Sequence, residues 1–191
     1  MRIAMANLRF RLVRAAEAAA VLGTAAAVSL PAAAAAPAPS ACTLLSPAIA
    51  AGLLKERPRT ILSTPLVCQY GRSSERASTT RSTVGLTIVR NATVAAAKAT
   101  QGRLEKIAPS KAPPGMTDFA RAKVSVPGGE ATFVYFRQAG GPIVGGYVFL
   151  RIGASTAQLT PDVRAAGGRA FTASDLRRAA SQLATNWAGT G

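Results

Sequence analysis

Apolar residues recur along this chain at two spacings, one typical of helices and the other of strands. Helical spacing predicts three helices, at 46–55, at 93–108 and in a C-terminal segment that begins at Ser174. Ser46 and Ser174 belong to the residue types that favour the N-cap position, and Pro47 suits the first turn. The apolar stripes of the second and third helices comprise Val94, Ala97, Leu104 and Ala108, and Leu176, Ala180, Leu183 and Trp187.

Runs rich in β-branched and aromatic residues predict the strands. They lie at 66–70, 83–90, 121–126, 130–137 and 143–152, with a short sixth candidate at 155–160. The fourth and fifth of these runs are separated by a short turn, which indicates a hairpin. The polar or proline-containing segments between the predicted elements are interpreted as loops, at 55–64, 72–81, 109–115 and 161–169.

The order of these elements is α-β-β-α-β-β-β-α. Consecutive strands joined by short turns favour antiparallel pairing. We therefore predict an α+β fold, an antiparallel sheet of about five strands with helices packed on one face.

The N-terminal segment, residues 1–36, has the three parts of a cleavable secretory signal. Arginines precede an apolar run at 18–30, and an alanine run at 32–36 offers cleavage sites. The apolar run is too short to span the ~30 Å hydrocarbon core of a bilayer, although retention as an anchor is an alternative. Residues 37–41 are an Ala/Pro tether, and 42–191 form a single domain with no predicted transmembrane helix.

Two cysteines, Cys42 and Cys68, remain after removal of the signal. A single pair in an exported protein predicts a disulfide, which would stabilise the fold by roughly 3 kcal/mol on the chain-entropy model. Two free thiols are the alternative. Lipidation of Cys42 is another, but Pro39 stands where a lipobox normally has leucine. A structural zinc site is disfavoured, because two cysteines without histidine do not complete a ligand set.

The chain contains no histidine, which removes the usual general base of a hydrolytic triad. Neither G-x-S-x-G nor S-x-x-K occurs, the acidic residues are scattered, and the glycine pairs match no phosphate-binding motif. Gly145 and Gly146 fall inside a predicted strand, where we interpret them as a bulge; contact with a ligand is the alternative. The sequence thus predicts no catalytic residue, metal or cofactor.

Positive charge is the feature with most bearing on function. Beyond residue 36 the chain has 19 basic and seven acidic residues, a net charge of +12. Such a surface attracts anionic lipid head groups or acidic wall polymers; simple solubility is the alternative, and no motif for specific nucleic-acid readout is present. The candidate binding residues, grouped in two loops, are Lys55, Arg57 and Arg59, and Arg72, Arg76 and Arg81.

The segment Ala41-Cys42-Thr43-Leu44-Leu45-Ser46-Pro47-Ala48, followed by Cys68-Gln69-Tyr70, resembles a known family pattern. It is similar to small secreted proteins and lipoproteins of actinobacteria with an N-terminal Cys-x-Leu-Leu-Ser/Thr helix and a second Cys in a following strand. Those families are largely of unknown function. The resemblance implies an extracytoplasmic location, a disulfide and the fold class, but no catalytic residue.

These observations predict a secreted or cell-envelope domain that is not an enzyme. It would serve as a binding or accessory module for an envelope protein or for an anionic lipid or wall polymer. An enzyme of unrecognised type, using Lys, Arg and carboxylate side chains, is the alternative.

Overall fold

The structure is a computed structural model that describes residues 39–76, 81–164 and 170–189. The predicted signal segment, 1–36, lies outside the described residues, as do the first two residues of the tether.

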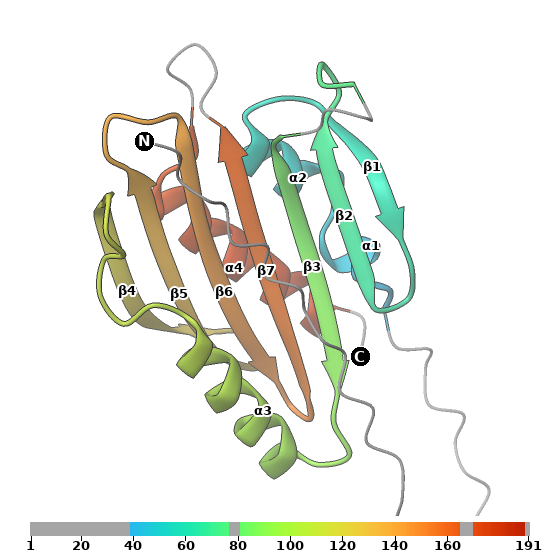
Figure 1. Cartoon of the computed structure of the whole chain (residues 1–191). Coiled ribbons are helices and arrows are strands. Elements are labelled where there is room, and N and C mark those ends of the chain that lie inside the picture. The colour runs from blue at the N-terminus through green and yellow to red at the C-terminus, as the bar shows by residue number, and fades with distance from the viewer. Residues whose placement is uncertain (1–38, 77–80, 165–169, 190–191) are drawn as a thin grey trace, which may run out of the picture. The chain divides into compact units, whose positions relative to one another are not determined.

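A seven-stranded antiparallel sheet forms the centre of the domain, in the order β1-β2-β3-β7-β6-β5-β4 (Figure 1). It consists of two meanders, β1–β3 and β4–β7, which join where β3 pairs with β7. The α+β class is therefore confirmed, but the prediction of about five strands is wrong. The strand bounds are β1 Pro58–Ser63, β2 Val67–Arg72, β3 Thr83–Arg90, β4 Met116–Val126, β5 Gly129–Gln138, β6 Ile143–Ile152 and β7 Ser155–Arg164.

The prediction of a loop at 55–64 is wrong because this segment contains the edge strand β1. Four of its six residues are exposed, so the strand lacks the alternation of buried and exposed positions that sequence patterns reveal. Pro58 stands at its first position, where a strand tolerates the missing N–H.

Strand β7 continues to Arg164, although Pro161 marked the start of a predicted loop. The strand is central, and Pro161 pairs with Val84 of β3. On the β6 side the paired positions stop at Gly145–Asp162 and resume at Val148–Leu159. The sheet accommodates the proline at this interruption, since a residue without N–H cannot donate to the ladder.

The helices lie on both faces of the sheet, so the prediction of a single helical face is wrong (Figure 1). Alternate residues of β5 separate the two cores: Phe133 and Tyr135 belong to the larger cluster, which includes the first, second and fourth helices. Val134 packs in a smaller cluster on the opposite face, with Leu104 and Ala108 at the third helix. The helix bounds are α1 Ala41–Leu44, α2 Pro47–Leu54, α3 Val94–Ile107 and α4 Ala173–Ala188.

Helix ends follow capping chemistry, with one departure from the predicted caps. Ser46 caps α2 as predicted, whereas α4 is capped by Thr172 rather than Ser174. Asp175 completes a capping box with Thr172 at the N-terminus of α4. Val94 is half exposed, at 53%, and does not belong to the buried stripe of α3.

Candidate anion-binding surface

The six basic residues singled out in the sequence do not form one free surface. Arg72 is buried, with 4% exposure, at the end of β2. Its Nε donates to the backbone oxygen of Leu54 at 3.1 Å and lies 3.9 Å from Oε2 of Glu56. Arg72 is thus part of the interior, where it completes the C-terminal end of α2.

Of the other five basic residues, some have partners within the domain and some are exposed to solvent. Lys55 forms a 2.8 Å ion pair with Asp175, and a guanidinium nitrogen of Arg59 donates to the Glu75 backbone oxygen at 3.3 Å. Arg76 also has an interaction partner. Arg57, Arg76 and Arg81 are exposed.

Carboxylates in the same loops offset much of this positive charge. Hydrogen bonds from Ser74 are the main reason that the pKa of Glu56 lies below its usual value. Burial raises the pKa of Glu75. Hydrogen bonds from the backbone N–H groups of Arg81 and Ser82 lower the pKa, and the net shift is downward. Both groups stay ionised at neutral pH, so they offset part of the positive charge of these loops.

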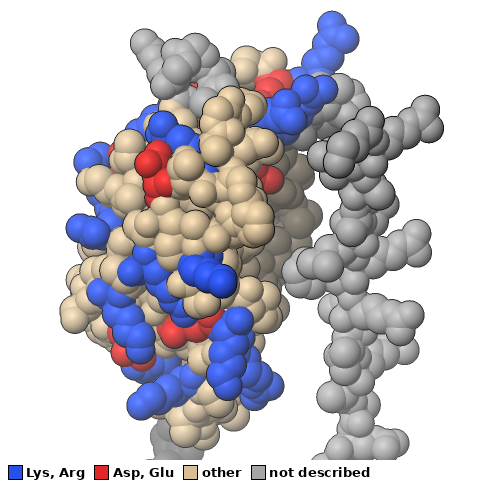
Figure 2. Space-filling model, turned by 60° about the vertical axis from the view of Figure 1, so that its left-hand side comes forward, with Lys and Arg blue, Asp and Glu red and all other residues tan. Residues whose placement is uncertain are grey.

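A second group of basic residues, not singled out from the sequence, lies over α3 and β4. Figure 2 shows Lys and Arg side chains gathered on the side of the molecule that carries these elements. Lys98 and Lys106 project from α3, and Lys123 lies on the exposed edge strand β4. These three ammonium groups make no hydrogen bond or ion pair with any described residue. We call this region the α3–β4 surface.

Arg121 of β4 fixes the position of α3 against the sheet rather than serving as a free cation. Its guanidinium donates to the backbone oxygens of Glu105, Ala108 and Pro109, at 3.1–3.4 Å. These carbonyls lie at the C-terminal end of α3, where helical carbonyls lack intrahelical partners. Thr132 of β5 adds a 2.8 Å hydrogen bond to the Glu105 carboxylate.

Two adjoining cavities form a groove between α3 and strands β4 and β5. They have Gly102 and Glu105 in common and volumes of about 150 and 530 Å³. The smaller is lined by Lys98, Gln101, Gly102, Glu105, Lys123 and Glu130, and the larger by Gly102, Glu105, Lys106, Ala108, Ser110 and Arg121. The groove therefore combines unpaired ammonium groups with hydrogen-bonding amide and carboxylate groups.

The signal for this surface was present in the sequence but divided between distant segments. Lys98 and Lys106 lie away from the apolar stripe of α3, as the helical spacing predicts. Lys123 joins them only because the sheet places β4 beside the helix. Basic residues that lie close together in the sequence pointed instead to the loops at 55–59 and 72–81.

Gly145 and Gly146 line a different cavity, of about 180 Å³, with Phe136, Tyr147 and Asp162. The bulge interpretation is wrong, because the register between β5 and β6 is continuous there. A Cβ at Gly145 would lie 2.5 Å from the Phe136 ring, so the glycine admits a close aromatic neighbour. Partial desolvation raises the pKa of Asp162 despite the nearby Arg164.

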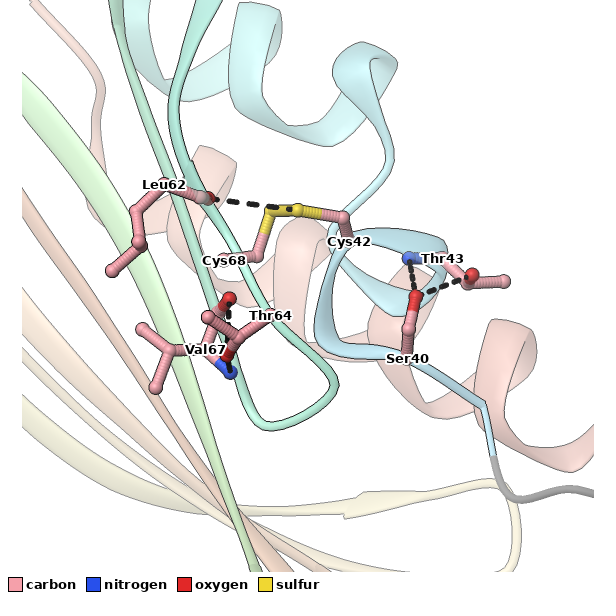
Figure 3. The surroundings of a disulfide bond; sticks show 7 residues. All are labelled: Ser40, Cys42, Thr43, Leu62, Thr64, Val67 and Cys68. Atoms are coloured by element: carbon pink, nitrogen blue, oxygen red, sulfur yellow. Dashed lines mark hydrogen bonds between the residues drawn. A yellow bond between two sulfur atoms is a disulfide. The ribbon is translucent and has the colours of Figure 1, made fainter.

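The predicted disulfide between Cys42 and Cys68 is confirmed, with Cα atoms 5.0 Å apart. It joins α1 to the buried part of β2 (Figure 3). Ser40 caps α1 beside it through a 3.2 Å hydrogen bond from the Thr43 N–H. With its sulfur bonded to Cys68, Cys42 has no thiol left for a lipid thioether.

The parts of the chain that the structure describes contain no group of three or more Cys, Asp or Glu side chains placed to hold a metal ion. None of their helices has the length and apolar character needed to cross a bilayer.

No protein-family model matches the chain, and no curated protein shows significant sequence similarity to it. The resemblance to small actinobacterial secreted proteins and lipoproteins therefore stays a prediction.

Proposed function

We propose that this protein is an exported, non-enzymatic module of the cell envelope whose α3–β4 surface binds an anionic lipid surface or wall polymer. The observation that carries the proposal is the set of unpaired ammonium groups of Lys98, Lys106 and Lys123 around one groove. The signal-like segment 1–36 supports export, and the disulfide suits an oxidising compartment.

A polyanion would bind there mainly through charge. Exposed charges are screened by salt, and the Debye length falls from ~10 Å at 0.1 M to ~3 Å at 1 M ionic strength. Binding should therefore weaken steeply as salt increases. Retention on neutral vesicles should be low at every salt concentration, because the proposed attraction is electrostatic.

Co-sedimentation across a salt series tests the proposal, with anionic vesicles, neutral vesicles and an insoluble acidic wall polymer as separate samples. The triple variant K98E/K106E/K123E should lose most of the low-salt retention on the anionic sample that binds the wild type. The double variant R57E/R81E is the control, because it reverses exposed charges in the loops predicted from the sequence and leaves the groove intact.

Equal retention of the wild type and the triple variant would overturn the proposal for this surface. Loss of binding in the loop control alone would move the site to the 55–59 and 72–81 loops. Comparison of the vesicle and polymer samples distinguishes a lipid source of the anion from a wall source.

A further inference from the structure

Gln101 occupies a position on α3 where the helical pattern calls for an apolar side chain. It lies four residues after Ala97 and three before Leu104, on the face that packs against the sheet. The residue is only 4% exposed, and its Oε1 is buried without a hydrogen-bond partner among the described residues. A buried amide oxygen without a partner costs free energy, and such groups in native proteins call for an explanation.

The explanation we favour follows from the cavity that Gln101 lines. The side chain forms part of the wall of the 150 Å³ compartment, together with Lys98 and Lys123. Rotation of the terminal amide would present either its oxygen or its NH₂ group to this compartment. After rotation of the oxygen toward the compartment, a ligand hydroxyl group would donate a hydrogen bond to it.

Gly102 supports the same interpretation from the backbone. It lies inside α3, where glycine is less favourable than alanine. A Cβ at this position would meet no atom within 4 Å, so packing within the domain does not require glycine. Gly102 lines both compartments of the groove, and the missing side chain leaves open space at this position.

The charges around the cavity indicate which anion suits it. Lys98 and Lys123 are point charges without partners among the described residues. The planar fork that binds a carboxylate or a phosphate bidentately belongs to arginine, and Arg121 directs its guanidinium to backbone carbonyls. Tetrahedral phosphate fits a pair of lysines, which bind it as point charges.

Two glutamates that line the cavity, Glu105 and Glu130, further restrict the kind of ligand that it can bind. Glu130 pairs with Arg151 at 3.2 Å, and Glu105 accepts the hydroxyl of Thr132. Both carboxylates disfavour a highly charged anion but accept hydrogen bonds from hydroxyl groups. The compartment is smaller than the ~300–1,000 Å³ of pockets for drug-sized ligands, so it suits a single head group.

Resting on the proposed function, we infer that the groove binds a hydroxylated phosphate of the glycerol phosphate type. Lys98 and Lys123 bind the phosphate, and the Gln101 amide binds a hydroxyl group. The same chemistry occurs in a glycerol-bearing phospholipid head group and in a poly(glycerol phosphate) wall polymer. Binding to vesicles or to the polymer identifies which of these is the source.

Titration of the full-chain protein with glycerol phosphate at low salt tests this inference, with inorganic phosphate and glycerol as separate probes. We expect glycerol phosphate to bind more tightly than either probe and to shift the side-chain amide resonances of Gln101 in ¹⁵N-labelled protein. Gln101→Met should weaken glycerol phosphate binding about tenfold and leave inorganic phosphate binding unchanged. Gln182→Met, the same replacement at an exposed site on α4, is the matched control.

Failure of the inference is distinguishable from failure of the proposed function. If Gln101→Met binds glycerol phosphate like the wild type, or if the amide resonances do not move, the inference is overturned. Salt-sensitive retention that K98E/K106E/K123E abolishes would still stand in that case. The Gln101→Met protein should unfold at a higher urea concentration than the wild type, so reduced binding would not reflect loss of folding.

Discussion

At the scale of single residues, burial decides which charged side chains are available to a partner. The sequence alone does not distinguish the surroundings of Arg72 and Lys98. Arg72 is 4% exposed and has internal partners, whereas Lys98 lies exposed at the rim of a groove. The difference arises from strand length: β2 continues to Arg72, which carries its guanidinium back to the end of α2. A basic residue next to a loop is therefore weak evidence for a binding surface.

Removal of the Arg72 side chain should destabilise the fold. Arg72→Ala leaves the Leu54 carbonyl without its donor, and an unsatisfied buried polar group costs about 1–3 kcal/mol. We expect a loss of this size in the free energy of unfolding, measured by urea denaturation. Arg57→Ala, at an exposed position, should stay within about 0.5 kcal/mol of the wild type; equal values for both variants would contradict the structural role of Arg72.

At the scale of elements, the sequence predicted the strands and helices with the strongest local patterns. The strand at 83–90 and the partner strand at 143–152 have the predicted bounds, and the β5–β6 hairpin forms as expected. Dense β-branched and aromatic residues specify these strands locally. The edge strand β1 and the second half of β7 were missed, because one is mostly exposed and the other contains Pro161.

The placement of the helices on the two faces of the sheet could not be predicted from the sequence, for a different reason. Consecutive residues of β5 are buried on opposite faces of the sheet, so both faces of the strand are apolar, as Phe133 and Val134 illustrate. This pattern requires cover on both sides of the sheet. The pattern of β5 does not indicate which helix covers which face of the sheet. The position of α3 beside β4 at the candidate site could therefore not be predicted.

Two helical glycines offer a matched test of the groove. Gly52 of α2 and Gly102 of α3 both have open space where a Cβ would lie. Replacement by alanine should therefore stabilise each helix by about 0.5–1 kcal/mol, measured as a higher urea midpoint. Gly102→Ala should also weaken binding of the anionic ligand, because its methyl group enters the groove, whereas Gly52→Ala should bind like the wild type.

Equal ligand binding by the two alanine variants would indicate that the ligand does not pass over Gly102. A loss of stability in Gly102→Ala would show instead that the helix needs glycine for its backbone conformation. Each result separates the local role of this residue from its proposed role at the surface.

At the scale of the whole molecule, a few carboxylates hold together segments that are distant in sequence. Asp175 links the start of α4 to Lys55 after α2, and Glu56 and Glu75 bind loop residues around β2. Burial raises the pKa of Asp175, but hydrogen bonds from Lys55 and Thr172 outweigh it and keep the pKa below its usual value. The pKa values of Glu56 and Glu75 are also lowered.

These shifts fix the sign of the pH dependence. A carboxylate with a lowered pKa in the folded state stabilises the fold above its unfolded pKa, here 4.5 for Glu56 and Glu75 and 3.8 for Asp175. That contribution is lost as the pH falls through the folded-state pKa. Asp162 acts in the opposite direction, because its raised pKa favours the fold below 3.8 and disfavours it as the pH rises through the folded-state value.

We therefore expect the urea midpoint to fall on acidification below about pH 4.5, since three lowered groups oppose one raised group. The double variant Glu56→Gln/Asp175→Asn should have a lower midpoint at neutral pH and a shallower decline in acid. Asp162→Asn also removes one negative charge, but it should raise the neutral-pH midpoint slightly and leave the acid decline at least as steep. A decline of equal slope in the double variant and the wild type would show that these carboxylates do not control the acid stability of the fold.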